Sequence, residues 1–420
     1  MSTTELTPAP LRFRRLFLPD PALTSCFGHH YNYTRAVAEA ARKRGIEVVI
    51  LSHANADPVV VQGLPALPLF RLGTYSELNL DDSVPNSDFD QYEVQGFQLV
   101  NMNMYFLNEL KTLNQVLGPD DMVFFHTIME HQILAITQWL AGFSPEQRPM
   151  SNLLLRFWHQ DRPHVTPMLQ LCSTVLNNPK LRSRFSTDTM ELASLYTNIV
   201  RGPVDLVPIP HSPAAHDGAQ GRRFLPDDLD PDTVVVGFLG DCRGNKGFMY
   251  LRSIIQQIFA NPPGKVHFLL QISNSSFPPA VMAEIQGLAA MAGMGITMVM
   301  ETLSAEDYYS LLDQTDIVLI SYYPKHYMYG SSGIFTESAS AGKVTVVPAG
   351  TNMEHEAMRF RTGFTSFADF TIESIADALH RAIQNYPVLA ERAETAAHTM
   401  TRYHNADNLV SYLLGEEFDY

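Results

Sequence analysis

Cysteine is scarce in this sequence. Three cysteines, Cys26, Cys172 and Cys242, are spread over 420 residues, and no two of them form a Cys-x-x-Cys pair. An odd number of widely separated cysteines indicates neither a disulfide framework nor a zinc site. The pattern fits a reducing compartment, and we expect a cytoplasmic protein.

Long apolar runs are also missing. No run approaches the roughly 18 residues that a membrane-spanning helix requires. Residues 1–15 are polar, contain proline and lack the apolar core of a signal peptide. We therefore expect no transmembrane segment, although peripheral contact with a membrane is compatible with the sequence.

Positive charge is in short supply too. Lys and Arg number 29 against 44 Asp and Glu, the net charge is −15, and the basic residues form no run. Binding to a nucleic-acid backbone needs clustered Lys and Arg, so a nucleic-acid partner is disfavoured. Any anionic ligand must be held by local groups, against the overall charge.

Length and composition indicate the architecture. A chain of 420 residues is too long for one ordinary core and suggests two domains of about 200 residues each. Short apolar runs alternate with helical patterns, which is typical of parallel α/β layers. In the first half we expect strands at 16–19, 47–51, 122–125, 153–157 and 206–209, and a helix at 34–44. The acidic segment 73–93 breaks the pattern and predicts a long loop, either a lid or a solvated surface excursion.

A stretch rich in Pro and Gly, 212–232, predicts the domain boundary. Beyond it we expect strands at 234–239, 266–271, 296–300, 317–321 and 344–348, and helices at 372–384, 387–399 and 409–414. Ser304 begins a plausible capping box for a further helix. The predicted domains are 1–215 and 233–395, with a helical segment, 396–420, packing back on the first domain.

The segment 329–343 is the most informative in the chain. A small-residue loop opens a short helix and consists of Gly330, Ser331, Ser332, Gly333 and Ile334. Free N–H groups at the positive end of a helix form an anion site. Glu337, expected in the first helical turn, could accept hydrogen bonds from hydroxyl groups. Phosphate and vicinal hydroxyls together describe a nucleotide or nucleotide sugar; the alternative is an ordinary βαβ connection whose Gly and Ser serve tight turns.

A second loop, 240–247, follows the first strand of the second domain. Ligands of open parallel sheets bind at the carboxyl ends of the strands, so Arg243 and Lys246 are placed to reach a bound anion. Two cations beside a pyrophosphate would neutralise charge as a sugar–phosphate bond breaks. The alternative is that both are solvated loop charges. Because no G-x-G-x-x-G opens either domain, a dinucleotide-binding dehydrogenase is disfavoured.

Histidines follow several strands of the first domain. Gly28 would let the backbone approach a ligand closely, and His29 and His30 beside it are either ligands or bases, or ordinary surface and packing residues. His126 and His159 each follow a predicted strand and should lie at the same edge.

The pattern His126-x-x-x-Glu130-His131 resembles a metal motif only superficially. Because it has no third, distant ligand, we predict no metal site.

These motifs carry a resemblance. Over nearly its whole length the chain resembles the retaining nucleotide-sugar glycosyltransferases of the GT-B fold, the glycosyl transferases group 1. Gly28 and the helix end at 40–48 look like the family's opening glycine loop and ALAxRGHEV-like segment. Gly240 and Lys246 are similar to its phosphate-binding G-x5-KG stretch, whereas Arg243 is shifted from the position where many members have arginine.

Two further segments match the family. Residues 300–304 and 316–318 resemble the part that frames the nucleotide base, and 337–343 matches the EAxAxGxPV helix, whose glutamate binds ribose hydroxyls. The family has a second glutamate eight residues earlier, against the donor sugar, and Tyr329 stands there in this chain. His159 is similar in place to the family histidine near that sugar.

The resemblance implies two Rossmann-like domains facing a cleft, and a C-terminal helix that crosses back to the first domain. It implies transfer of a sugar, with retention and without metal or cofactor, from a nucleotide donor to a saccharide, lipid-linked or other small acceptor. The implied catalytic residues are Arg243, Lys246, His159 and Tyr329. The implied donor-binding residues are Gly28, Gly240, Thr302, Leu303, Gly330, Ser331, Ser332, Gly333, Ile334 and Glu337. His29, His30 and His126 are expected on the acceptor side.

Two alternatives stay open. The altered residue at Tyr329 suits a non-catalytic nucleotide-sugar-binding subunit, and the same fold serves other reactions such as sugar-nucleotide epimerisation.

Overall fold

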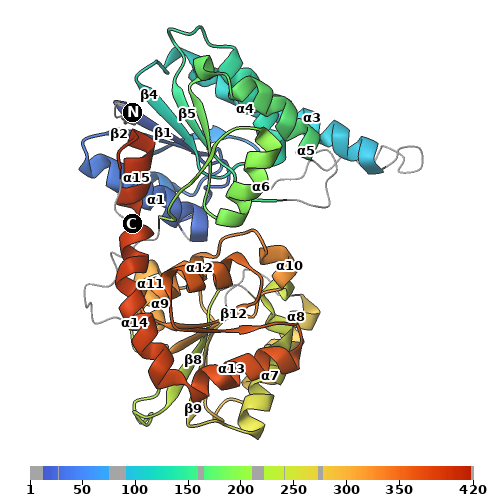
Figure 1. Ribbon diagram of the computed structural model, residues 1–420, viewed down its shortest axis with the longest axis vertical. Coiled ribbons are helices and arrows are strands. Elements are labelled where there is room, and N and C mark those ends of the chain that lie inside the picture. The colour runs from blue at the N-terminus through green and yellow to red at the C-terminus, as the bar shows by residue number, and fades with distance from the viewer. Residues whose placement is uncertain are drawn as a thin grey trace, which may run out of the picture. The chain divides into compact units, whose positions relative to one another are not determined.

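The computed structural model describes residues 13–26, 28–74, 91–158, 165–210, 222–240, 242–272 and 278–417; side chains 59, 61, 62, 91–99, 130 and 131 are outside this description. The chain divides into two units (Figure 1). The first unit comprises the chain up to Pro210 and, in addition, the segment from Ala406 onward. The second unit ends at Asn405.

The first unit contains a parallel sheet of seven strands in the order β3-β2-β1-β4-β5-β6-β7. The strands are β1 (Arg15–Pro19), β2 (Glu47–His53), β3 (Ala66–Phe70), β4 (Asp121–Phe125), β5 (Met150–Leu154), β6 (Ser183–Thr187) and β7 (Val204–Leu206). The helices are α1 (Gly28–Lys43), α2 (Pro58–Gly63), α3 (Gln91–Lys111), α4 (Glu130–Ala141), α5 (Val165–Leu176), α6 (Met190–Val200) and α15 (Ala406–Leu414), with 3-10 turns η1 (Thr112–Gln115) and η2 (Pro179–Leu181).

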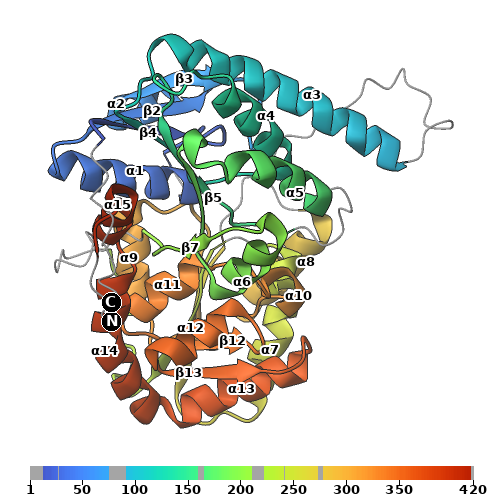
Figure 2. The same ribbon diagram turned by 45° about the horizontal axis from the view of Figure 1, so that its top comes forward.

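Helices α1 and α15 pack together on this sheet, as Figure 2 shows. The core here includes Leu16 of β1, Val37 of α1 and Leu409 of α15, all fully buried. Polar contacts add to this packing: Arg44 Nη2 donates to Ser411 Oγ at 2.7 Å, and the Tyr412 hydroxyl donates to Asp205 Oδ2 at 2.7 Å. The predicted return of the C-terminal helix to the first domain is therefore confirmed.

The second unit contains a parallel sheet of six strands in the order β10-β9-β8-β11-β12-β13. The strands are β8 (Val234–Phe238), β9 (Val266–Gln271), β10 (Ile296–Val299), β11 (Ile317–Leu319), β12 (Val344–Pro348) and β13 (Phe364–Phe367). The helices are α7 (Phe248–Ala260), α8 (Pro279–Ala289), α9 (Ala305–Asp313), α10 (Pro324–Tyr327), α11 (Gly333–Ser340), α12 (Asn352–Phe360), α13 (Ile372–Gln384) and α14 (Tyr386–Tyr403), with the 3-10 turn η4 (Gly244–Lys246).

Helices cover both faces of the second sheet. Successive side chains of a strand point to opposite faces, so a strand that is apolar throughout needs helices on both sides. Val236 of β8 packs with α7 and α13, whereas its neighbour Val235 packs with α9 and α11 on the opposite face. Figure 1 shows α7 and α13 together on one side of the strands. Among the helices of the described ranges, none combines the length and apolar character needed to cross a bilayer.

Sequence patterns predicted most of these elements. Strands β9 and β12 and helix α13 have the predicted bounds, and Ser304 caps α9 by accepting a hydrogen bond from the Asp307 amide at 3.1 Å. Strands β3, β6 and β13 were missed, because Pro, Ser, Thr and Arg interrupt their apolar pattern.

Other predicted bounds were wrong. Strand β5 spans Met150–Leu154 rather than 153–157, although burial continues to Arg156, and β7 spans Val204–Leu206 rather than 206–209. Helix α1 begins at Gly28 rather than at 34. Of the predicted loop 73–93, residues 75–90 lie outside the described residues, and Glu93 belongs to α3. Residues 212–221 of the predicted boundary also lie outside the described residues, and the domain limits stay predictions.

Candidate functional site

The loop between β8 and α7 lies at the carboxyl edge of the second sheet. Gly240 has φ +99°, and its amide donates to Gln271 Oε1, at the end of β9, at 3.1 Å. Gly247 has φ +76°, and a Cβ placed there would lie 2.1 Å from the Ser321 carbonyl oxygen after β11. Only glycine fits both the left-handed backbone and this close approach. The loop is thereby fixed against the ends of two neighbouring strands.

Lys246 is enclosed by this loop. The residue is only 7% exposed, and its Nζ lies 5.6 Å from the ring centre of Tyr322. A Cβ at Gly240 would lie 3.3 Å from Lys246 Nζ and 2.8 Å from Ile334 Cδ1, so three predicted residues meet at one point. Arg243 precedes η4 and is exposed. The structure thus brings one buried cation to the start of α11 and leaves Arg243 on the surface.

Helix α11 begins with an open N-terminus. Ser332 is its N-cap: Oγ accepts from the Phe335 amide at 3.2 Å, and the carbonyl accepts from the Thr336 amide at 3.0 Å. The amides of Gly333 and Ile334 have no preceding helical turn to bind, which leaves them directed outward at the positive end of the helix. This geometry suits an anion.

Glu337 lies in the second turn of α11, not in the first turn as predicted, because the helix begins only at Gly333. Its Oε2 accepts a hydrogen bond from the Tyr308 hydroxyl of α9 at 2.8 Å. Desolvation by the surrounding protein raises the pKa of Glu337 to about 7, although the Tyr308 bond acts in the opposite direction. The carboxylate is therefore close to its titration point at neutral pH.

The remaining predicted donor residues belong to the segments before α9 and before α11. Leu303 is buried among the side chains that pack beneath α9, whereas Thr302 is exposed. Tyr329, Gly330 and Ser331 are partly buried and connect α10 to α11.

At the carboxyl edge of the first sheet, a fully buried carboxylate has several partners. Asp20, directly after β1, accepts hydrogen bonds from His30 Nδ1 at 2.8 Å and from the Thr34 hydroxyl at 3.1 Å. His126, directly after β4, lies 3.1 Å from the Thr34 hydroxyl and stacks on Tyr33, with ring centres 4.8 Å apart. Burial lowers the pKa of His126 to about 4, although Asp20 acts in the opposite direction. Burial opposes ionisation of Asp20, but His126 and His30 outweigh it and hold the Asp20 pKa below its usual value.

A second group adjoins this one. Arg156, after β5, donates from Nε to Asp188 Oδ2 at 2.7 Å and from Nη1 to His29 Nε2. Its guanidinium also lies 5.3 Å from the ring centre of Tyr33. Desolvation by the surrounding protein and the Arg156 charge lower the pKa of His29 well below its usual value. His29 is thus neutral and has a fixed tautomer.

The sequence analysis predicted only some of these residues at the carboxyl edge of the first sheet. His126 is fully buried, and its expected place on the acceptor side stays a prediction. His159 lies outside the described residues. Asp20 was missed although it follows a predicted strand, which is the signal that should have identified it. Arg156 was missed because the predicted strand extended over it.

Gly28 begins α1 with φ +81°, and nothing lies within 4 Å of a Cβ placed there. In the part of the chain that is described, no three His, Cys, Asp or Glu side chains are arranged as metal ligands. The side chains of Glu130 and His131 lie outside that part.

No protein-family model matches the sequence, and no curated protein matches it. The fold, however, is similar to solved structures over nearly the whole chain. A glycosyltransferase from Rickettsia africae has a TM-score of 0.64 at 13% identity, covering 96% of this chain and 97% of that one. A sucrose-phosphate synthase from Thermosynechococcus elongatus has a TM-score of 0.64 at 14% identity, with 95% and 97% covered.

The HepE protein of Anabaena, solved in complex with UDP, has a TM-score of 0.62 at 12% identity, with 96% and 99% covered. A second HepE structure contains UDP and glucose. This chain has two parallel α/β units, of seven and six strands, and a C-terminal helix that returns to the first unit. The chain has the GT-B fold.

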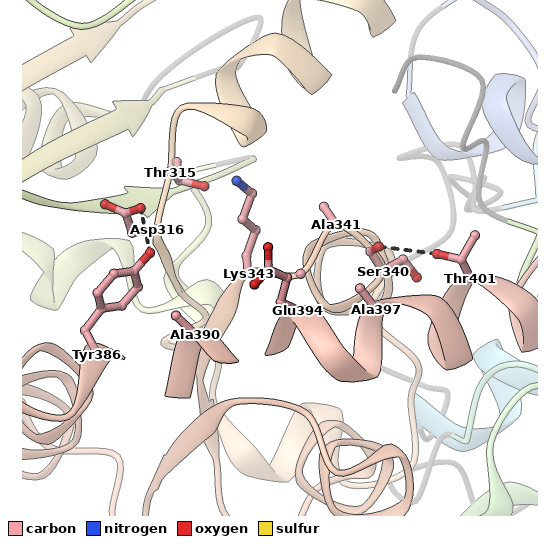
Figure 3. A pocket seen from close by; sticks show the side chains of 11 residues that line it. Thr315, Asp316, Ser340, Ala341, Lys343, Tyr386, Ala390, Glu394, Ala397 and Thr401 are labelled. Atoms are coloured by element: carbon pink, nitrogen blue, oxygen red, sulfur yellow. Dashed lines mark hydrogen bonds between the residues drawn. The ribbon is translucent and has the colours of Figure 1, made fainter. Parts of the chain in front are cut away.

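A cavity of about 520 Å³ lies at the other edge of the second sheet of this GT-B chain (Figure 3). Its lining includes Asp316 and Lys343, which precede β11 and β12. Tyr386 donates to Asp316 Oδ1 at 2.8 Å, and Lys343 Nζ donates to the Asp313 carbonyl at 2.9 Å. Ligands of open parallel sheets bind at the carboxyl ends of strands, so this cavity is not the candidate site.

Proposed function

We propose that this GT-B protein is a glycosyltransferase that moves a sugar from a nucleoside-diphosphate sugar to a hydroxyl group of an acceptor. One observation carries the proposal: Lys246 of the β8–α7 loop lies close to Ile334 at the start of α11, and the same helix carries Glu337, at the carboxyl edge of the second sheet. A cation with helix amides suits a diphosphate, and a carboxylate beside them suits ribose hydroxyls.

The chemistry follows from these charges. As the bond between the anomeric carbon and the phosphate oxygen breaks, the electron pair stays on the diphosphate. Lys246 and the Gly333 and Ile334 amides would stabilise that developing charge, with Arg243 adding an exposed cation. We propose that these groups suffice without metal, and that the departing phosphate takes the acceptor proton, which gives retention of configuration.

The acceptor is proposed to bind the first unit. His30 is its best-placed side chain, because Nδ1 is held by buried Asp20 while the His30 side chain remains 15% exposed. His29, His159 and Tyr329 keep their proposed places beside the acceptor or the donor sugar. A cytoplasmic location, where nucleotide sugars are made, is part of the same proposal.

One observation favours a second candidate. Tyr329 stands where a sugar-contacting glutamate is expected, which suits a subunit that binds a nucleotide sugar without transferring it. A GT-B enzyme of another reaction, such as epimerisation, would release a nucleotide with an altered sugar.

Product analysis separates these functions. UDP-glucose is the first donor to use, because UDP and glucose occupy the HepE structure; UDP-N-acetylglucosamine, GDP-mannose and ADP-glucose follow. Slow release of UDP without acceptor supports a transferase. Thermal stabilisation without release or transfer supports a binding subunit, since a ligand at 100 times its Kd adds roughly 2.7 kcal/mol. No stabilisation by any of these donors would reject the proposal.

A further inference from the structure

We propose that Tyr308 is a positioning residue that orients the Glu337 carboxylate toward the ribose hydroxyls of the donor nucleotide. This inference rests on the proposed function, because it concerns the same donor site. It explains how that site would distinguish a ribonucleotide from its deoxy analogue. Tyr308 belongs to α9 and Glu337 to α11, so the contact joins two separate helices on one face of the second sheet.

The hydrogen bonds of the carboxylate are unequal. Oε2 accepts from the Tyr308 hydroxyl at 2.8 Å, whereas Oε1 accepts no hydrogen bond from any described residue. A carboxylate fixed through one oxygen presents the other in a single direction. Preorganised acceptors of this kind discriminate strongly, because a ligand without the matching hydroxyl leaves a polar group unpaired.

The surroundings of Glu337 make this bond important for its charge as well. Its hydrogen-bond partner among the described residues is Tyr308 of α9, which is itself close to Tyr309 and to Tyr322 after β11, and Lys246 Nζ lies over the Tyr322 ring. No described Lys, Arg or His forms an ion pair with Glu337. The Tyr308 bond therefore opposes the effect of burial, which raises the pKa of the carboxyl group.

The chain offers a matched control. Tyr386 donates to Asp316 Oδ1 at 2.8 Å in the same unit, but at the amino edge of the sheet, beside the cavity in Figure 3. Tyr386→Phe removes the same kind of bond as Tyr308→Phe, at the same distance and away from the proposed donor site.

The experiment is calorimetric titration of the full chain and of both variants with UDP and 2′,3′-dideoxy-UDP, between pH 6 and 9. Tyr308→Phe is expected to weaken UDP binding roughly tenfold and dideoxy-UDP binding about twofold, so that the preference for ribose shrinks. The pH at which UDP affinity reaches half its maximum should also rise. Tyr386→Phe should leave both properties unchanged.

Equal ribose preference and equal pH midpoint in Tyr308→Phe and the parent would overturn the inference while leaving nucleotide binding in place. A parent that binds none of UDP, ADP and GDP would instead reject the proposed function itself. Should Tyr308→Phe lose its cooperative melting transition, Glu337→Asp replaces it. This variant draws the carboxylate back from Tyr308 by one methylene and should show the same loss of ribose preference.

Discussion

The carboxyl edges of the two sheets hold their polar groups in opposite ways. At the first edge, side chains satisfy one another: Asp20 binds His30 and Thr34, and Arg156 binds Asp188. At the second edge glycines and backbone make the closest contacts, Lys246 lies near the start of α11, and Glu337 accepts one side-chain hydrogen bond within the described ranges, from Tyr308. The first arrangement fixes side chains in place, whereas the second leaves the Gly333 and Ile334 amides and Glu337 Oε1 without a hydrogen-bond partner among the described residues.

Glycine substitutions should give the largest difference between the edges. Gly247→Ala adds a Cβ 2.1 Å from the Ser321 carbonyl oxygen in a left-handed backbone, and we expect a loss of roughly 4 kcal/mol in the free energy of unfolding. Gly28→Ala has the same backbone strain but no close neighbour, and it should cost about 1 kcal/mol. Denaturant unfolding of both variants checks this; equal losses would show that the β8–α7 loop is not rigid.

Loss of the buried cation should come next. Lys246→Ala is expected to slow sugar transfer by about 3 kcal/mol in the barrier, or roughly a hundredfold, and Arg243→Ala less, because Arg243 is exposed. Lys343→Ala, at the opposite edge of the same sheet, is the control and should retain activity. Unchanged turnover in Lys246→Ala would make this lysine merely structural.

Acidification should lower the stability of the carboxyl edge of the first sheet and raise that of the second. The pKa of His126 is about 4 in the folded protein and 6.5 in the unfolded chain. The contribution of neutral His126 to the free energy of unfolding is therefore complete above pH 6.5 and is lost as the pH falls toward 4. Between pH 7 and 5 this amounts to about 2 kcal/mol. The pKa of Glu337 is about 7 in the folded protein and 4.5 in the unfolded chain. The contribution of protonated Glu337 to the free energy of unfolding is therefore complete below pH 4.5 and is lost as the pH rises through 7. Hydrogen exchange, corrected for its intrinsic pH dependence, should therefore show α1 loosening first on acidification; loosening of α11 first would contradict this.

The smallest expected effect concerns Tyr329. Tyr329→Phe should change donor preference or turnover severalfold while leaving affinity for the free nucleoside diphosphate nearly intact. Competition between UDP-sugars, with UDP titration alongside, tests this. Equal loss of UDP affinity would place Tyr329 against the base or the phosphates instead.

How much of the molecule the sequence predicts depends on how local each feature is. Strand β12 and the Ser304 cap are encoded by neighbouring residues, so both could be identified from short patterns. The contact of Asp20 with His126 was not predictable in this way, because it depends on β1 pairing with β4, about a hundred residues later. The Tyr308–Glu337 contact likewise joins two helices that only the fold brings together.

The central claim is that the second unit binds a nucleoside diphosphate through Glu337 and the groups beside it. Calorimetric titration with UDP, comparing the parent with Glu337→Gln at pH 8, tests it most directly, because the substitution keeps the shape but supplies an amide in place of two acceptor oxygens. We predict at least a tenfold loss of affinity, about 1.4 kcal/mol, with a melting temperature no lower than the parent's, because the amide stays neutral where the buried carboxylate ionises. Undiminished UDP binding in Glu337→Gln would contradict the claim.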